Sequence, residues 1–413
     1  MNDTSERGWR PRRRAVAATS AVVVSGLAIS YVAYALLAPL PAVYSTVQPL
    51  PAISTPSSSV SLPGYGSSAI GAVDDTRIFA ATELDTPRPI ASITKVITAL
   101  VVLEARPVEE GSAGEQLTLT AADARLRDRY VAVGGSVAPA PEGLMISQRQ
   151  VIELMMVHSA NNYAETLAVW AFGSVDAYLF EARAWLDRND LTTINVADTT
   201  GFSPSNTASP RALIALGRLA LADPVVSAAS ELPAATVAGV GTYTNRNRIL
   251  GIDGVTGLKT GTLDEAGACL LFTAEHDIDG ETVRVVGVVL GGPNHQQLAA
   301  DVRVLLASIR DDYHDLQVSD EGQIVALYET PWGERVRLEV AESVDALVWG
   351  GVNTRASLTP PTLQPGVKMP PPPPLTVRYG GKTVEISVRF VGELDGPDLV
   401  WRLGQPVVEL FGR

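Results

Sequence analysis

The distribution of apolar residues divides this chain of 413 residues into differently patterned regions. Residues 15–38 are apolar except for Gly, Ser, Thr and two Tyr, and about 20 such residues suffice for one membrane-spanning helix. Residues 39–68 are rich in Pro, Ser and Gly, so they bury little and predict an extended linker. Residues 69–316 mix helical and strand patterns, and residues 317–413 alternate with a period of two.

Residues 69–316 have the pattern of a mixed α/β catalytic domain with its own core. Strands are expected where apolar runs are short and valine-rich, at residues 70–73 and 284–290. Helices are expected where apolar residues recur every three or four positions, at residues 92–105, 147–157, 210–222 and 299–309. The first of these helices is apolar on several faces, which predicts that it is buried on all sides.

Residues 317–413 predict a small all-β domain at the C-terminus. Two pairs of alternating segments each flank a short glycine-containing turn, which is typical of hairpins, at residues 324–329 with 334–340 and 375–379 with 382–390. Residues 369–374 are a proline run, which cannot form a central strand and is expected in a loop or at an edge.

Charge is unevenly distributed along the chain. The formal net charge of −13 argues against a nucleic-acid partner, because phosphate binding needs a basic surface. Residues 1–14 are basic, with five Arg against two acidic residues, and no further charge occurs before Asp74. A basic segment before an apolar stretch is expected to stay cytoplasmic, which places the later domains outside the cell membrane. An uncleaved single-pass anchor is favoured because the stretch exceeds the usual apolar core of a cleaved signal peptide, about 7–15 residues; secretion after cleavage is the alternative.

The first candidate for chemistry is Ser92-Ile93-Thr94-Lys95, inside the helix predicted at residues 92–105. Residues three apart share one face of a helix, so the Ser92 hydroxyl and the Lys95 amine can meet. A hydroxyl needs a nearby base to become a nucleophile, and a lysine serves when burial and neighbouring cations keep it neutral. Alone, this spacing also arises by chance in many helices.

Two further segments are weak alone and gain weight from their order. Ser159-Ala160-Asn161 follows the predicted helix at residues 147–157 and offers a hydroxyl and an amide. Lys259-Thr260-Gly261-Thr262 offers a cation and hydroxyls on a strand that glycine allows to lie against a ligand. Three motifs in this order are the signature of serine penicillin-recognising enzymes.

The segments around these motifs resemble the D-alanyl-D-alanine carboxypeptidases, the low-molecular-mass penicillin-binding proteins. The resemblance is carried by residues 89–99, 198–202 and 257–267 and covers roughly residues 69–310. It implies a penicillin-recognising serine transpeptidase/β-lactamase-like catalytic domain of α/β (α+β) type, with the small C-terminal β domain and an N-terminal transmembrane helix. The implied substrates are peptidoglycan stem peptides ending in D-Ala-D-Ala, the implied inhibitors are β-lactams, and no cofactor is implied.

The resemblance also implies a role for each matching position. Ser92 would be the nucleophile, Lys95 its base, and Ser159 a proton relay towards the leaving D-Ala. Asn161 would bind the stem-peptide amide, Lys259 would keep the local field positive, and Thr260 would hold the terminal carboxylate. The backbone N–H groups of Ser92 and Thr262, beside Gly261, would form the oxyanion hole.

One departure from the family pattern concerns the substrate carboxylate. Relatives often carry an arginine a few residues after the Gly-Gly that ends the valine-rich strand, but here residues 293–298 contain none. His295, or an arginine from elsewhere, is a candidate replacement. Without such a replacement, Thr260 and Lys259 would provide most of the binding of the substrate carboxylate, and turnover of peptides would be weak.

Three competing interpretations remain. A serine β-lactamase would need a glutamate that positions the deacylating water, and Glu165 is the acidic residue nearest the second motif. A catalytically weak wall-binding protein would explain the missing arginine but not the intact motifs. A zinc peptidase is disfavoured because the four histidines, His158 among them, form no ligand pair.

The single cysteine, Cys269, cannot form an internal disulfide and is expected to be a small buried residue.

Overall fold

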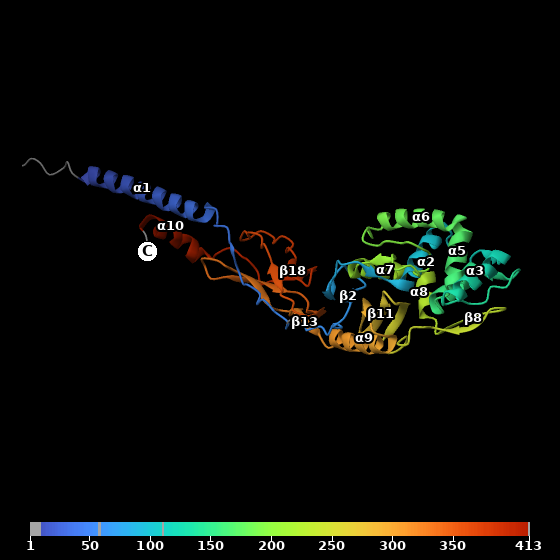
Figure 1. The fold of residues 1–413 in the computed structure, drawn as a ribbon. Helices are drawn as coiled ribbons and strands as arrows, with labels where there is room; N and C mark the ends of the chain where they lie inside the picture. The colour runs from blue at the N-terminus through green and yellow to red at the C-terminus, as the bar shows by residue number, and fades with distance from the viewer. Residues whose placement is uncertain (1–9, 57–58, 110, 412–413) are drawn as a thin grey trace, which may run out of the picture. The chain divides into compact units, whose positions relative to one another are not determined.

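The computed structural model describes residues 10–56, 59–109 and 111–411, and the chain forms two compact units (Figure 1). The first unit combines Met1–Ser57 with His314–Arg413, and the second is Ser58–Tyr313. The second unit therefore begins earlier and ends slightly earlier than the catalytic domain predicted at residues 69–316.

A five-stranded antiparallel sheet forms the base of the second unit, in the order β10-β11-β12-β2-β3. Figure 1 shows α7 and α9 on opposite faces of this sheet. The central strands are buried along most of their length, which explains why β12 reads as a valine run in the sequence. The strands are β2 (Ser67–Ala72), β3 (Ile78–Thr82), β10 (Val255–Leu263), β11 (Gly267–Ile278) and β12 (Glu281–Gly292), and the two covering helices are α7 (Pro210–Ala222) and α9 (His295–Arg310).

The helices of the second unit surround α2 (Thr94–Ala105), which is preceded by the 3-10 turn η1 (Ala91–Ile93). Helix α2 packs against α4, α5, α6, α7 and α8, and its residues from Thr94 to Leu103 are all buried. This burial is what its apolar residues on several faces predicted. The other helices are α3 (Ala121–Ala132), α4 (Gln148–Val157), α5 (Asn161–Phe172), α6 (Val175–Arg188) and α8 (Pro224–Glu231).

Three two-stranded pairs complete the second unit. They are β4 (Arg88–Pro89) with β7 (Thr207–Ala208), β5 (Gln116–Thr118) with β6 (Met145–Ser147), and β8 (Ala234–Val237) with β9 (Gly241–Thr244).

The first unit contains three small sheets around a core of its own. Their strand orders are β1-β14-β15-β20, β13-β16 and β17-β18-β19. The hairpins predicted from the alternating segments are present as β14–β15 and β18–β19. The strands are β1 (Ser45–Val47), β13 (Tyr313–Ser319), β14 (Ile324–Glu329), β15 (Arg335–Val340), β16 (Val344–Trp349), β17 (Arg355–Ser357), β18 (Leu375–Tyr379), β19 (Lys382–Ile386) and β20 (Val388–Val391).

The segment predicted as a linker at residues 39–68 differs from that expectation. Strand β1 adds an edge to the four-stranded sheet of the first unit, called the β unit below, by pairing with β14, and Val43 is buried in the core of this unit. Ser54 forms a further bridge to Asn353. Prolines are tolerated at a sheet edge, so a Pro-rich stretch can extend a sheet while looking like a linker in sequence.

Two helices flank the β unit in sequence. Helix α1 (Arg10–Leu37) contains an apolar stretch, Ala15–Leu37, long enough to cross a membrane, although a signal sequence would satisfy the same criterion. Helix α10 (Leu399–Phe411) was not predicted, because the sequence of this region was interpreted only through its period-two alternation.

Because residues 43–47 belong to the β unit, we expect substitutions at two neighbouring positions to differ in their effect on stability. Val43→Asp would bury a carboxylate in the β unit and should cost several kcal/mol of unfolding free energy. Tyr44→Asp changes a side chain that is 74% exposed and should leave stability within about 0.5 kcal/mol. Thermal melts of both variants test this, and equal stability of the two would show that the segment is a free linker.

Candidate active site

Ser92 lies in a turn that the fold holds in an uncommon backbone conformation. The preceding residue, Ala91, has φ = 46° although it is not glycine, and Ala91 and Ile93 are buried on either side of Ser92. Such conformations persist only where the surroundings determine them. The turn aims Ser92 into a cavity of about 400 Å³.

Lys95 lies directly beneath Ser92, as the three-residue spacing in the sequence predicts. Its Nζ is 2.9 Å from Ser92 Oγ, 2.6 Å from Asn161 Oδ1 and 2.6 Å from the Thr200 carbonyl oxygen. The side chain is fully buried. An amine with two acceptors at this distance can give each of them one N–H and keep its lone pair for the serine hydroxyl.

The surroundings of Lys95 disfavour an ammonium ion. Burial lowers the pKa of Lys95 well below that of a free lysine, and the positive charges of Lys259 and Arg246 lower it further. The negative charge of Asp198 acts in the opposite direction and raises it. The sum leaves Lys95 with a strongly lowered pKa.

Ser159, which lines the cavity, forms a second hydroxyl–amine pair with the buried Lys259. Lys259 Nζ donates to Ser159 Oγ at 3.0 Å and to the Thr260 carbonyl oxygen at 3.0 Å. Ser159 has φ = 61°, a left-handed conformation, in the short connection between helices α4 and α5. Burial, with the charge of Arg246 as a second cause, lowers the pKa of Lys259 to about 7.

Two glycines allow separate segments to close around the nucleophile. A Cβ at Gly261 on β10 would lie 2.9 Å from the Ile90 carbonyl oxygen and 3.1 Å from the Ser92 nitrogen. A Cβ at Gly201 would lie only 1.8 Å from the Ala91 carbonyl oxygen. Both sites therefore require glycine for the backbone to approach the Ser92 turn.

The carboxylate of Asp198 organises the loop that supplies the Thr200 carbonyl to Lys95. It accepts hydrogen bonds from the backbone nitrogens of Thr200, Gly201 and Ser203 at 2.6–2.7 Å and from the Asn206 side chain at 3.0 Å. These bonds lower the pKa of Asp198 although burial opposes them. Asp198 thus remains a carboxylate and fixes the loop.

The cavity also contains groups that the motifs did not reveal. Arg246 and Arg248 line it beside Thr260, Thr262 and His295, together with Ser136 and Thr244. Neither arginine forms an ion pair with any residue that the structure describes. Two unpaired guanidinium groups in one cavity indicate an anionic ligand. The alternating Asn245-Arg246-Asn247-Arg248 sequence gave no signal, because only the folded loop brings it beside β10.

His295 lines the cavity and lies within residues 293–298, where this sequence lacks the arginine that relatives often carry. Its Nε2 lies 2.6 Å from Thr262 Oγ1, and burial, with the nearby charges of Arg248 and Lys259, lowers its pKa. His295 is therefore expected to be neutral at neutral pH and to act as a hydrogen-bond partner of Thr262 rather than as a cation.

The other residues considered as candidates from the sequence are held in packing contacts or hydrogen bonds that do not involve Ser92 or Lys95. The Glu165 carboxylate accepts hydrogen bonds from Arg129 and from the Tyr130 hydroxyl, so it is committed to these partners. His158 stacks against Tyr243, and Cys269 is buried in β11. Within residues 10–56, 59–109 and 111–411, no group of three or more His, Cys, Asp or Glu side chains is arranged to hold a metal ion.

Residues 66–294, more than half of the chain, match the D-alanyl-D-alanine carboxypeptidase family of peptidases. The chain belongs to this family. The enzyme class follows: it is a hydrolase of the serine-type D-Ala-D-Ala carboxypeptidase class. The resemblance noted from the motifs is thereby confirmed.

Individual relatives match between half and two thirds of this chain. The D-alanyl-D-alanine endopeptidase of Haemophilus influenzae is 26% identical over 218 residues, covering 51% of this chain and 71% of that protein. The carboxypeptidase DacD of Salmonella typhimurium is 25% identical over 259 residues, covering 62% of this chain and 65% of that protein.

Solved structures confirm the predicted fold class. A Streptomyces DD-transpeptidase superposes with a TM-score of 0.53 at 21% identity, covering 62% of this chain and 98% of that one. The D-alanyl-D-alanine carboxypeptidase DacD from Francisella tularensis superposes with a TM-score of 0.55 at 17% identity, covering 80% and 94%.

Proposed function

We propose that this protein removes the terminal D-alanine from peptidoglycan stem peptides through an acyl-enzyme on Ser92. The observation that carries the proposal is the contact between Ser92 Oγ and the buried Nζ of Lys95. A lysine that burial and neighbouring cations keep neutral is a base, and the hydroxyl beside it becomes a nucleophile.

Acylation begins when Lys95 Nζ accepts the hydroxyl proton of Ser92 and Oγ bonds to the carbonyl carbon of the penultimate D-alanine. The negative charge then develops on the former carbonyl oxygen. The backbone N–H groups of Ser92 and Thr262 are the proposed oxyanion hole, since Gly261 allows β10 to approach the Ser92 turn. One such donor contributes roughly 3–4 kcal/mol of transition-state stabilisation.

Departure of D-alanine needs a proton on its nitrogen as the carbon–nitrogen bond breaks. Ser159 is placed to deliver it, because it lines the cavity and its hydroxyl contacts the Nζ of the buried Lys259. With a pKa of about 7, Lys259 can replace the proton that Ser159 gives away. Water then hydrolyses the Ser92 ester, which releases the shortened peptide. Asn161, which holds Lys95 through Oδ1, is proposed to bind the peptide amide with its remaining polar atoms.

The terminal carboxylate of the substrate is proposed to bind between Thr260 and Arg248. Both line the cavity, and Arg248 has no ion-pair partner among the described residues. The positive charge of Arg246 acts on Lys95 and Lys259, so Arg246 is proposed to supply the positive field rather than a direct contact with the substrate. In this proposal Arg248 replaces the arginine that is absent from residues 293–298. Weak turnover of the peptide, which the sequence suggested because of that absence, is then no longer expected.

A β-lactamase is the alternative activity on this fold. Fast deacylation would need a carboxylate free to position water, whereas Glu165 is held by Arg129 and Tyr130. The proposed enzyme should therefore acylate with β-lactams and release them slowly, so that β-lactams act as inhibitors. Nitrocefin turnover measures this directly.

We further propose that α1 stays attached as a single-pass membrane anchor with the second unit outside the cytoplasm. The basic residues before it and its 23-residue apolar stretch support this arrangement. Secretion after cleavage of α1 is the alternative, and N-terminal sequencing of the purified protein distinguishes the two.

The acyl-enzyme is tested by labelled penicillin and intact mass. One acyl group should appear on Ser92 by tryptic mapping, and Ser92→Ala should remove it. Lys95→Arg keeps a permanent charge and should slow acylation by about 10²–10⁴-fold. The matched control Lys382→Arg, on an exposed position of β19, should label like the wild type.

A label on another serine would overturn the assignment of the nucleophile. Normal acylation of Lys95→Arg would remove Lys95 from the role of base. Thermal melts of each variant separate a folding defect from a chemical one.

The carboxylate site is tested with Arg248→Gln and a diacylated tripeptide ending in D-Ala-D-Ala. Loss of a charged hydrogen-bond donor should lower kcat/KM for D-alanine release by roughly 10- to 150-fold, mainly through KM. The control Arg183→Gln, an exposed residue of α6, should leave kcat/KM unchanged. If Arg248→Gln turns over the peptide normally, another group holds the carboxylate.

A further inference from the structure

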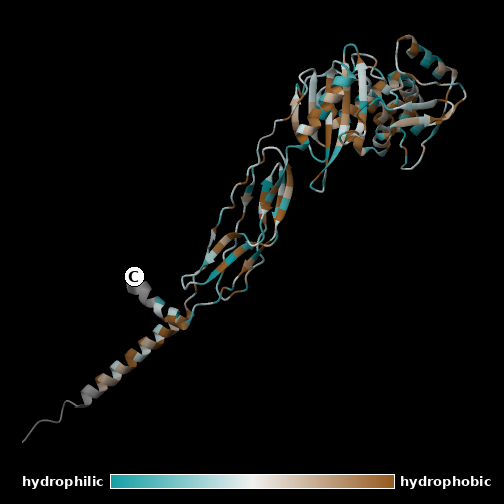
Figure 2. Cartoon of the chain, turned by 90° about the horizontal axis from the view of Figure 1, so that it is seen from below, coloured by the Kyte–Doolittle hydropathy of each residue, from teal (hydrophilic) through white to brown (hydrophobic). Residues whose placement is uncertain are grey.

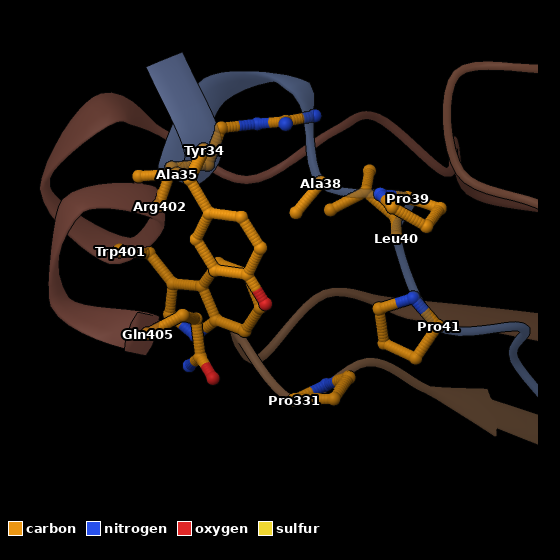
Figure 3. Close-up of a pocket in the computed structure, with 10 residues that line it drawn as sticks. All are labelled: Tyr34, Ala35, Ala38, Pro39, Leu40, Pro41, Pro331, Trp401, Arg402 and Gln405. Carbon is orange, nitrogen blue, oxygen red and sulfur yellow. The ribbon is translucent and has the colours of Figure 1, made fainter. Parts of the chain in front are cut away.

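Two cavities of the structure differ in the groups that line them. Figure 3 shows a cavity of about 240 Å³ at the end of α1, where Leu40 and Pro41 contribute apolar surface. Helix α1 beside it carries hydrophobic residues along its length, as Figure 2 shows. The cavity beside Ser92 is lined instead by hydroxyl, imidazole and guanidinium groups. One hydrogen bond among these groups joins His295 to Thr262, and it has no part in the proposed reaction.

His295 reaches Thr262 across a row of small residues in the sheet. Thr262 on β10 pairs with Ala268 on β11, and Ala268 pairs with Gly292 at the end of β12. Residues that pair directly in an antiparallel sheet share one face, so only the Ala268 methyl group lies between Thr262 and the end of β12. His295 follows Gly292 by three residues, and its Nε2 lies 2.6 Å from Thr262 Oγ1. The imidazole thus links the end of β12 to the edge strand β10.

The start of α9 holds the imidazole in a fixed place. His295 is the first residue of α9, and the side-chain oxygen of Asn294 caps this helix by accepting hydrogen bonds from the backbone nitrogens of Gln296 and Gln297. Leu298, in the same helical turn, is buried in the packing of α9 against the sheet. The cap and this packing leave the first turn little freedom, so His295 is a firm point to which β10 can be tied.

Thr262 lies where β10 benefits from such a tie. Strand β10 is at the edge of its sheet with β11 as its ladder partner, and Thr262 is the last residue but one before the strand ends at Leu263. The Thr262 side chain is exposed, so packing alone does not fix it. Ends of elements open more readily than their centres. A displacement of about 1 Å at a catalytic group can cost on the order of 10²-fold in rate.

We propose that His295 is a positioning residue, which holds the end of β10 through Thr262 and so keeps the Thr262 N–H aimed at the developing oxyanion. The inference rests on the proposed function, in which this N–H is one of two oxyanion donors. His295 does not touch the reacting atoms in this arrangement and acts only through Thr262.

A role for His295 as a cation that binds the substrate carboxylate fits the structure less well. Its Nε2 is already engaged by Thr262 Oγ1. Burial and the charges of Arg248 and Lys259 lower its pKa, so the ring is expected to be neutral at neutral pH. A neutral ring can accept the Thr262 hydroxyl hydrogen at Nε2 while Nδ1 carries the ring hydrogen. The permanently charged Arg248 is the better partner for a carboxylate.

The test follows single-turnover acylation of Ser92 in the full chain at increasing concentrations of a labelled β-lactam. The series separates the limiting rate, which reports oxyanion stabilisation, from the half-saturation concentration, which reports binding of the ligand and its carboxylate. His295→Phe keeps a ring without nitrogen, Thr262→Val removes the hydroxyl at similar size, and His295→Gln restores a polar group of similar reach. Gln296→Ala, at the exposed next position of α9, is the matched control.

His295→Phe and Thr262→Val should each lower the limiting rate by roughly 10-fold and leave the half-saturation concentration within about 2-fold, because both remove the same hydrogen bond. The double variant should be no slower than either single variant, since the two side chains act as a unit. His295→Gln and Gln296→Ala should acylate like the wild type. Thermal melts of all variants separate lost folding from misplaced chemistry.

A normal limiting rate in His295→Phe, or effects that multiply in the double variant, would overturn the proposal. A loss confined to the half-saturation concentration would also overturn it and make His295 a carboxylate ligand. If His295→Phe does not fold, Thr262→Val decides, because a normal limiting rate in that folded variant shows that the bond is not needed. A wild-type chain without label on Ser92 would contradict the proposed function itself, whereas a labelled wild type with unaffected variants contradicts only this inference.

Discussion

A buried lysine with no carboxylate partner among the described residues is the constraint around which the candidate active site is organised. Lys95 is fully buried, and its three contacts are a hydroxyl, an amide and a backbone carbonyl rather than an ion-pair partner. Burying an ammonium in this way is costly unless the group gives up its proton. The fold adds two more cations near it, Lys259 and Arg246, which increases that tendency. The proposed chemistry at Ser92 depends on this arrangement.

The rest of the site serves to build that environment. The Asp198 carboxylate anchors the loop whose Thr200 carbonyl contacts Lys95, and the negative charge of Asp198 partly offsets the cations. Close packing of three chain segments around Ser92 depends on Gly201 and Gly261, where any side chain would collide with the turn. The site is therefore assembled from segments distant in sequence that meet only when α2 is enclosed by the other helices.

The sequence predicted the parts of the site that depend on local spacing. Ser92 and Lys95 lie one helical turn apart, so their contact followed from the chain itself, and the glycine-containing strand at Gly261 followed from its motif. The presence of Arg246 and Arg248 in the cavity could not be predicted, because they reach it through a loop whose course depends on the fold. In the same way β1 looked like a linker, since its strand pairing is supplied by β14 far along the chain. Helix α10 was missed because its apolar spacing was outweighed by the period-two pattern before it.

The most direct measurement of the central claim is the pH dependence of Ser92 acylation by labelled penicillin. Acylation should rise as Lys95 loses its proton, with a midpoint well below the 10.5 of an unperturbed lysine. Arg246→Gln removes a positive neighbour, which favours the ammonium form and should move the midpoint to higher pH. The exposed control Arg183→Gln should leave it in place. A wild-type midpoint near 10.5, or an unchanged midpoint in Arg246→Gln, would contradict the claim that burial and neighbouring cations keep Lys95 neutral.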